Sequence, residues 1–444
     1  VISLVSYVLT KVAVTVYAGG LVFQQVFGIK ELWGIDFFWI AAIGLVVLTA
    51  LYTIFGGMKS VLYTSVLQTP ILLLGSLIIL VLGFKELGGW DEMMRVCGAV
   101  TVNDYGDTMT NLIRSNDDAN FPWLGALIGS AIIGFWYWCT DQFIVQRVLS
   151  GKNEMEARRG TIFGAYLKLL PVFLFLIPGM IAFALHQKYI GAGGEGFLPM
   201  LANGTANADA AFPTLVAKLL PAGVKGLVVC GILAALMSSL ASLFNSSAML
   251  FTIDFYKRFR PETPEKKLVG IGQVATVVIV ILGILWIPIM RSVGDVLYTY
   301  LQDVQSVLAP GIAAAFLLGI CWKRTSAQGG MWGLIAGMVI GLTRLGAKVY
   351  YSNAGEVADS TFKYLFYDMN WLFFCGWMFL FCIIVVIVVS LATKAPTAEK
   401  IQGLVFGTAT KEQKAATRAS WNHWDIIHTV IILAITGAFY WYFW

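Results

Sequence analysis

Repeated long apolar runs are the feature that most constrains the fold of this chain. Of its 444 residues, 58% are hydrophobic and only 12% are charged, and the mean hydropathy is +0.78. A helix needs about 20 apolar residues to cross a bilayer, and a water-soluble chain carries about twice this share of charge. The sequence predicts an all-α polytopic membrane protein, because an open sheet edge would leave backbone groups unpaired in lipid.

Eleven membrane spans are predicted from apolar windows of about 19 residues. They cover residues 1–28, 37–57, 61–84, 122–149, 161–185, 224–251, 269–290, 296–321, 331–349, 371–391 and 426–444. We expect them to form one transmembrane domain over residues 1–444. Because the chain begins with Val1 inside an apolar run, we also expect it to lack its natural N-terminus.

Basic residues between the spans indicate the orientation. Alternate loops with the adjoining span ends, beginning with the loop after residues 37–57, hold 17 basic residues, against 11 in the other loops and their adjoining span ends. Cytoplasmic loops carry the excess of Lys and Arg. We therefore predict a multi-pass protein of the plasma membrane with its C-terminus outside. The net charge of +5 is too small and too dispersed to suggest a nucleic-acid partner.

Two adjacent serines in the span 224–251 indicate a cation site. Ala235, Ser238 and Ser239 stand at positions i, i+3 and i+4, which share one face of a helix. Hydroxyl and carbonyl oxygens suit a hard cation such as sodium. The alternative is that each hydroxyl donates to the carbonyl four residues earlier in its own helix, which is common.

An aromatic pair and a lysine indicate a polar ligand. Tyr137 and Trp138 lie within the span 122–149, and Lys168 lies within the span 161–185. Aromatic rings stack on the C–H faces of sugars while ammonium and amide groups bind hydroxyls, so the set suits a polyhydroxylated ligand. Core packing or a membrane-interface belt also explains the rings, and Lys168 also fits a side chain that extends to the membrane surface.

The span 296–321 combines polar side chains with a proline. Gln302 and Asp303 precede Pro310, which removes one helical hydrogen bond. Interrupted helices mark binding sites in secondary transporters, and a simple packing kink is the alternative.

Two further observations narrow the choice. Gly333, Gly337 and Gly341 recur every four residues in the span 331–349, a pattern that predicts close helix packing rather than chemistry. No phosphate-binding G-x-x-x-x-G-K-[ST] loop and no G-x-S-x-G serine motif is present in the sequence. We therefore expect neither an ATP-driven pump nor an enzyme.

Four segments carry a recognisable family pattern: FWYWCTDQFIVQRVLSGKN (135–153), ALYTIFGG (50–57), LMSSLASLFN (236–245) and AAFLLGICWKR (314–324). They resemble the sodium/glucose cotransporters of the solute:sodium symporter family. The resemblance runs along nearly the whole chain and implies a LeuT-type fold, in which two inverted five-helix repeats and additional helices give about fourteen spans. Eleven of these are present here.

The resemblance also implies how the spans are divided. The first repeat would be incomplete and cover residues 1–84, and the second would cover about 122–321. Additional C-terminal helices would follow at 331–349, 371–391 and 426–444. The missing spans would be a leading helix and the first two helices of the first repeat, which would supply further sodium ligands and sugar contacts.

Roles for five residues in sugar binding follow from the resemblance alone. Tyr137 matches the family's inner-gate tyrosine beneath the sugar, and Trp138 is its neighbour at the site. Lys168 and Gln302 match partners of sugar hydroxyls. Lys11 matches a polar position that lines the site.

The resemblance implies that Ala235, Ser238 and Ser239 form the family's conserved sodium site. Two positions depart from the family pattern. Ser65 stands where the family usually has Asp, and Ala241 stands where carriers with a second sodium site have Thr. Since both departures remove an oxygen donor, we expect one sodium per sugar.

The resemblance therefore predicts sodium-driven symport of a hexose, glucose- or galactose-like, by alternating access, with sodium, the sugar or polyol and the lipid bilayer as partners. Two alternatives remain open: the cargo is myo-inositol or another polyol, or the protein is a sugar-gated ion-conducting sensor that does not accumulate sugar. Proton coupling is less favoured because Ser65 replaces the Asp. The sequence carries no information on an accessory subunit.

Overall fold

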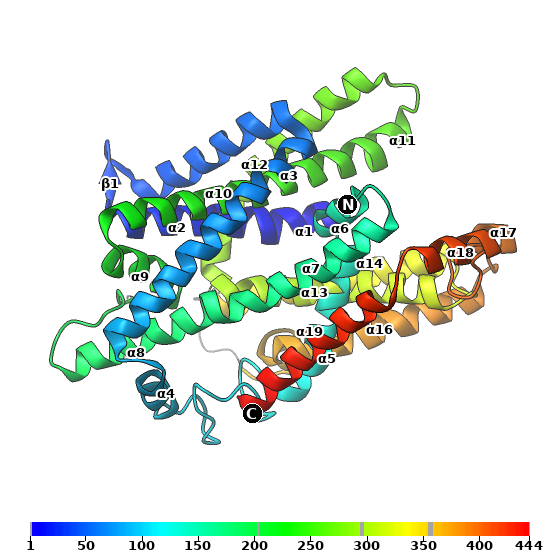
Figure 1. Cartoon of the computed structure of the whole chain (residues 1–444). Helices are drawn as coiled ribbons and strands as arrows, with labels where there is room; N and C mark the ends of the chain where they lie inside the picture. The colour runs from blue at the N-terminus through cyan, green and yellow to red at the C-terminus, as the bar shows by residue number, and fades with distance from the viewer. Residues whose placement is uncertain (1, 202–203, 294–296, 354–357, 444) are drawn as a thin grey trace. The chain divides into compact units, whose positions relative to one another are not determined.

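Helices make up nearly all of the regular structure (Figure 1). The computed structural model describes residues 2–201, 204–293, 297–353 and 358–443. Three predicted span ends, at Val1, Val296 and Trp444, lie outside these residues. The chain divides into two compact units, one formed by Ser3–Thr110 with Leu167–Arg291 and the other by Asn111–Tyr166 with Ser292–Trp444. The predicted repeats, residues 1–84 and about 122–321, divide the chain differently from these two units, and they remain a prediction.

The first unit holds the following elements in chain order: α1 (Ile2–Ser6), the π-helix η1 (Tyr7–Val12), α2 (Ala13–Phe27), the strands β1 (Glu31–Leu32) and β2 (Ile35–Asp36), α3 (Phe37–Leu87), α4 (Trp90–Gly98), the π-helix η3 (Val172–Leu176), α8 (Ile177–Gly191), the 3-10 helix η4 (Ala208–Ala210), α9 (Ala211–Leu219), α10 (Ala222–Met249), the π-helix η5 (Leu250–Tyr256), α11 (Lys257–Phe259) and α12 (Glu265–Val293). The two short strands pair as an antiparallel hairpin.

The second unit holds α5 (Trp123–Phe135), the π-helix η2 (Trp136–Thr140), α6 (Gln142–Leu149), most of α7 (Glu154–Pro171), α13 (Leu297–Cys321), α14 (Ala327–Asn353), α15 (Thr361–Lys363), the π-helix η6 (Tyr364–Asp368), α16 (Trp371–Ala392), α17 (Ala398–Ile401), α18 (Lys411–Ala419) and α19 (His423–Tyr442). The remainder of α7, from Leu167, belongs to the first unit.

The membrane spans follow the apolar runs. Within the described residues, nine helices are long and apolar enough to cross a membrane, and two shorter apolar helices, Ala13–Phe27 and Phe37–Leu51, occupy the two remaining predicted positions. The sequence predicted a loop between residues 57 and 61, but α3 continues through this region. At 1.5 Å per residue its 51 residues are far longer than a bilayer is thick. The two halves of α3 run in different directions (Figure 1). The second half, Leu62–Leu87, is a candidate span, and the first contains the shorter apolar helix Phe37–Leu51.

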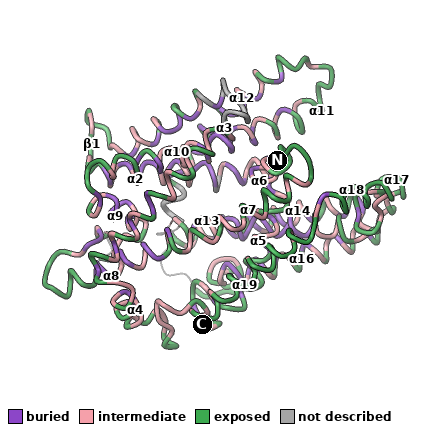
Figure 2. The backbone as a smooth tube through the Cα atoms, viewed as in Figure 1, coloured by how far each residue is buried: buried purple, intermediate pink, exposed green. Residues whose placement is uncertain are grey.

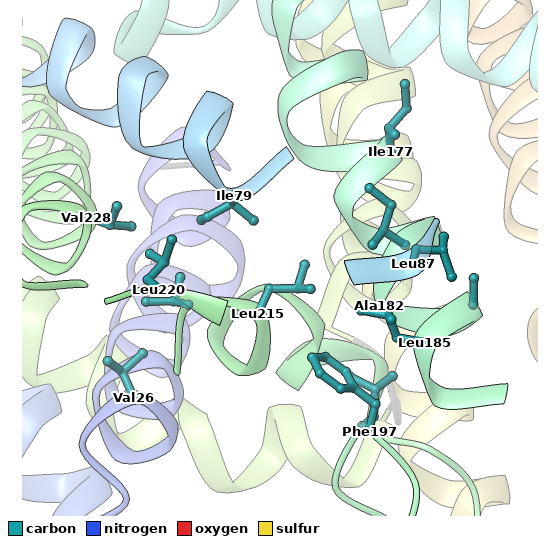
Figure 3. Packing of buried hydrophobic residues seen from close by; sticks show 14 of the residues in the cluster. Val26, Ile79, Leu87, Ile177, Ala182, Leu185, Phe197, Leu215, Leu220 and Val228 are labelled. Atoms are coloured by element: carbon teal, nitrogen blue, oxygen red, sulfur yellow. The ribbon is translucent and has the colours of Figure 1, made fainter. Parts of the chain in front are cut away.

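The core of the first unit lies between α3, α8, α9 and α10 (Figure 3). Ile79, Ile181 and Leu215 are fully buried in this cluster of aliphatic and aromatic side chains. Helices α3 and α10 approach closely where Gly75 faces Val228, since a Cβ at Gly75 would lie 2.7 Å from the valine side chain. The absence of a side chain at Gly75 therefore allows α3 and α10 to approach closely.

The core of the second unit is built on α13, the most buried of its candidate spans (Figure 2). The predicted glycine packing is confirmed. A Cβ at Gly337 of α14 would lie 2.8 Å from the Cα of Gly311 in α13, while Gly341 abuts the backbone of Val307. Helix α13 is continuous through Pro310, so the predicted interruption is absent there and the packing alternative holds. Neighbouring helices support the weakened backbone, which is why membrane helices tolerate proline.

Candidate functional site

Two hydroxyl groups from two helices meet in the first unit, and a third serine follows directly on one of these helices. Ser238 of α10 is buried, and its Oγ lies 2.6 Å from Oγ of Ser65 on α3. Ser239, one residue further along α10, is half-buried. The close approach of α3 and α10 therefore adds the hydroxyl of Ser65 to the predicted pair of serines.

Hydrogen bonding within α10 separates the two interpretations of these serines. Ser242 and Ser246 donate to the carbonyls of Ser238 and Ser242, at 3.0 and 2.8 Å, so they form the bond to the carbonyl four residues earlier. Ser238 pairs with Ser65 instead. In the described part of the chain, the Ser239 hydroxyl has no hydrogen-bond partner. The back-bonded alternative applies to Ser242 and Ser246 but not to the predicted pair.

The donors at this point suit an alkali cation. They are neutral hydroxyl oxygens, to which the Ala235 carbonyl adds another oxygen on the same face of α10. Neutral oxygens satisfy a hard, singly charged ion without the charge that a divalent ion requires. Ser65 supplies a hydroxyl where an Asp would have supplied a full negative charge.

Lys11 lies on η1, which packs against α10. Its side chain is buried, with 7% of its surface exposed, and its ammonium lies 5.1 Å from the ring centre of Tyr7. A cation over an aromatic face is partly compensated for the loss of water. Lys11, one of the predicted sugar-binding residues, therefore lies on a segment that packs against α10, the helix of Ser238 and Ser239.

Lys168 is exposed on α7, in the part that belongs to the first unit. Exposure fits both interpretations of this residue, a side chain that reaches the membrane surface and one that faces a polar path.

The predicted aromatic pair lies on a π-helix. Tyr137 and Trp138 belong to η2, and their rings meet edge to face with centres 5.2 Å apart. The helix ends at Asp141, whose backbone is extended and whose carboxylate accepts the Phe143 amide at 3.2 Å, capping α6. Segments of π-helix are frequent at functional sites because they redirect side chains. The break in regular helix occurs here rather than at Pro310.

Gln302 lies on α13, against which η2 packs. Trp136, Ala309 and Ala313 belong to one buried cluster, and Tyr137 packs against it. The Gln302 amide donates to the Tyr298 hydroxyl at 3.2 Å. The second unit thus brings together the helices of Tyr137, Trp138 and Gln302.

A buried charge cluster next to Gln302 was not predicted as a unit. Asp303 pairs with Lys348 at 2.6 Å and with the fully buried Arg344 at 3.5 Å. The Arg344 guanidinium also donates to the carbonyl of Met369 at 2.7 Å and lies 4.1 Å from the ring centre of Phe374. One feature of the sequence could have indicated this cluster. Arg344 and Lys348 stand four residues apart within a predicted span, and charged side chains inside a membrane span need a partner of opposite charge.

The predicted site residues thus fall into two groups. Lys11, Lys168, Ala235, Ser238 and Ser239 lie in the first unit. Tyr137, Trp138 and Gln302 lie in the second.

The comparison with known proteins identifies the family. Residues 1–337 match the model of the sodium:solute symporter family. The sodium/mannose cotransporter SLC5A10 of Bos taurus is 35% identical over 100% of this chain and 76% of its own length. The human sodium/myo-inositol cotransporter 2 is 35% identical and the sodium/glucose cotransporter 1 of Ovis aries 37% identical, over 92% and 89% of this chain. The chain spans 61% of the length of each of these last two relatives.

A solved structure shows the same fold. It is the substrate-bound outward-open state of a sodium-coupled sialic acid symporter, with a TM-score of 0.65 and 21% sequence identity. The similarity covers 89% of this chain and 75% of the symporter. The predicted LeuT-type fold is confirmed.

Proposed function

Because the chain belongs to the sodium:solute symporter family, we propose that it carries a sugar or polyol across a membrane together with sodium. The observation that carries the proposal is the cluster of hydroxyls around Ser238, in which Ser239 has no hydrogen-bond partner among the described residues. The multi-pass chain belongs to a family of transporters rather than enzymes, as the sequence predicted.

Sodium binds on α10 in this proposal. The Ala235 carbonyl and the hydroxyls of Ser238 and Ser239 coordinate the ion, and Ser65 holds the Ser238 hydroxyl at 2.6 Å. One sodium moves per sugar, because Ser65 lacks the carboxylate of other members and the buried Ala241 offers no side-chain oxygen.

The sugar binds through Tyr137, Trp138, Lys168, Gln302 and Lys11. The rings stack on its C–H face, and the amide and ammonium groups donate to its hydroxyls. Sodium binding favours the outward-open state, and the loaded protein then rocks to release both ligands inward. A membrane potential supplies about 2.3 kcal/mol per charge per 100 mV, so one sodium supports up to about a fifty-fold accumulation from the potential alone.

A hexose is the proposed cargo and a polyol such as myo-inositol is the second candidate. The relatives described above are named for mannose, myo-inositol and glucose at similar identities. Competition among these three compounds for uptake distinguishes the candidates.

We further propose a plasma-membrane location with the C-terminus outside, on the basis of the loop charges. The contact between α7 and α19 supports this orientation. Both helices follow predicted cytoplasmic loops, and Tyr166 and His428, which touch, lie in the N-terminal halves of the candidate spans Glu154–Gly191 and His423–Tyr442.

The test of the sodium site is a pair of serine substitutions in the full chain reconstituted into vesicles. Ser239→Ala removes a proposed ligand and is expected to raise the sodium concentration for half-maximal uptake about tenfold or more. This factor corresponds to the free energy of one hydrogen bond to a charged group. Ser246→Ala on the same helix removes a hydroxyl that donates to the Ser242 carbonyl and is not a proposed ligand, and it is the matched control. Equal sodium dependence in both variants would contradict the proposed site.

The sugar site is tested separately. Gln302→Ala is expected to raise the half-saturating sugar concentration about tenfold while sodium dependence changes little, because the amide contacts the sugar and not the ion. Tyr298→Phe removes only the hydroxyl that receives the amide and should have a smaller effect. A sugar-evoked current without uptake would instead identify the protein as a sensor.

A further inference from the structure

A cavity of about 390 Å³ lies between α7 and α19, and none of the proposed sodium or sugar ligands lines it. It is lined from α7 by Arg159, Phe163 and Tyr166, and from α19 by Trp424 and Asp425 among others. These residues lie in the N-terminal halves of the candidate spans Glu154–Gly191, which α7 begins, and His423–Tyr442. The cavity therefore lies toward one end of both spans, on the side where a membrane meets water.

Helix capping fixes the α19 side of this cavity. Asn422 accepts the Trp424 amide at 2.9 Å, and Oδ2 of Asp425 accepts the Asn422 amide at 2.8 Å. One carboxylate oxygen of Asp425 is used in this cap. The Asp425 carboxylate is therefore held in place at the cavity wall, with its other oxygen available for a ligand.

Aromatic rings fix the contact between the helices. The Tyr166 hydroxyl lies 3.0 Å from Nδ1 of His428, with ring centres 5.8 Å apart. The Trp424 ring lies 6.3 Å from that of His428. Aromatic faces of this kind attract ammonium groups.

Opposite charges line this cavity without neutralising each other. In the part of the chain that the structure describes, neither Arg159 nor Asp425 forms an ion pair. A ligand that carries both an anionic and a cationic group would satisfy both side chains. Guanidinium groups bind phosphate, and a carboxylate next to aromatic faces binds an ammonium group.

The surroundings of α19 favour a lipid over a soluble zwitterion. No described residue of α19 is buried, as Figure 2 shows, and Val430 and Leu433 are more than half exposed. The far end of the helix is held by a hydrogen bond from the Leu112 amide to the Phe443 carbonyl at 2.9 Å. The apolar surface between these two attachments offers a path for acyl chains that begins at the cavity.

We propose that this cavity binds the headgroup of phosphatidylethanolamine. The phosphate binds Arg159, and the primary ammonium donates to the free oxygen of Asp425 beside the rings of Trp424 and Tyr166. Phosphatidylcholine has the phosphate but no N–H to donate, and phosphatidylglycerol lacks the cation. The order of affinity is therefore phosphatidylethanolamine above both of the other lipids.

Native mass spectrometry of the full chain, titrated in detergent with each of the three lipids, tests the proposal. Phosphatidylethanolamine is expected to bind about tenfold more tightly than the others. Arg159→Gln and Asp425→Asn should each remove this preference, and the asparagine oxygen keeps the cap. Arg158→Gln, an exposed neighbour that does not line the cavity, is the matched control and should keep the preference.

Three outcomes would overturn the proposal. They are equal binding of the three lipids, equal loss in the Arg158 and Arg159 variants, and displacement of the lipid by an equal concentration of soluble phosphoethanolamine. The last would identify a soluble ligand as the occupant. Trp424→Leu, which leaves both charges and the cap in place, should weaken binding also, and it provides a second variant if Asp425→Asn does not fold. None of these results depends on transport.

Discussion

Replacing Arg344 with methionine is predicted to destabilise the second unit by about 3–5 kcal/mol, the usual cost of removing one partner from a buried ion pair. The Arg344 side chain is fully buried and lies 3.5 Å from Asp303. It also donates to the carbonyls of Leu365 and Met369, at 3.4 and 2.7 Å, near the end of η6. Methionine keeps much of the apolar stem, so the loss reports on the charge and its hydrogen bonds.

Two lysines calibrate this effect. Lys348 lies only 2.6 Å from Asp303, but 22% of its side chain is exposed. When the lysine is replaced, water can therefore take over part of its interaction with Asp303. Lys348→Met is expected to cost about 1 kcal/mol. Lys363 pairs with Asp359, which is 94% exposed, and Lys363→Met is expected to leave stability unchanged. The order of the three losses should follow the burial of both partners of each pair, because Lys348 and Lys363 are similarly exposed, at 22% and 20%, while their partners Asp303 and Asp359 are 11% and 94% exposed.

Thermal unfolding of the purified variants in one detergent measures this order. A double-mutant cycle with Asp303→Asn adds a second test, because the loss in the double variant should be smaller than the sum of the two single losses. An unfolding temperature for Arg344→Met equal to that of Lys363→Met, or strictly additive losses, would refute the reasoning.

Two other predictions concern packing and reactivity. Gly337→Ala should cost about 1–3 kcal/mol, because its Cβ would lie 2.8 Å from the Gly311 backbone, whereas Gly346→Ala on the same helix meets nothing within 4 Å and should be neutral in thermal unfolding. Equal stability of the two variants would contradict the packing. Burial disfavours the charged thiolate and raises the pKa of Cys97 to about 11, so maleimide labelling at pH 8 should be much slower at Cys97 than at the exposed Cys321, and should accelerate as the pH rises. Equal labelling rates at pH 8 would contradict this assignment.

The positions of the spans could be predicted from the sequence because each depends on a local run of apolar residues. The glycine pattern in α14 was equally informative, since the spacing of four residues places Gly333, Gly337 and Gly341 on one face. The loop expected before residue 61 was wrong, because the backbone of α3 keeps its helical hydrogen bonds through two glycines. The interruption expected at Pro310 was also wrong, because the helices packed around α13 support the helix through this proline.

Long-range contacts at the site could not be predicted. Ser65 and Ser238 are 173 residues apart in the chain, so the sequence identified each position but not their contact. The pairing of Asp303 with Arg344 is of the same kind, because no local pattern connects the two helices. The π-helix at Tyr137 also has no signature in the residues themselves, since it depends on how the surrounding helices redirect the chain.

Sugar uptake into vesicles containing the full chain, with either sodium or choline as the external cation, tests the central claim most directly. The account predicts that sodium drives labelled hexose or polyol above its external concentration and that an inside-negative potential increases this accumulation. With choline, uptake should fall to the level of vesicles without protein. Uptake that is the same with choline as with sodium would contradict the account.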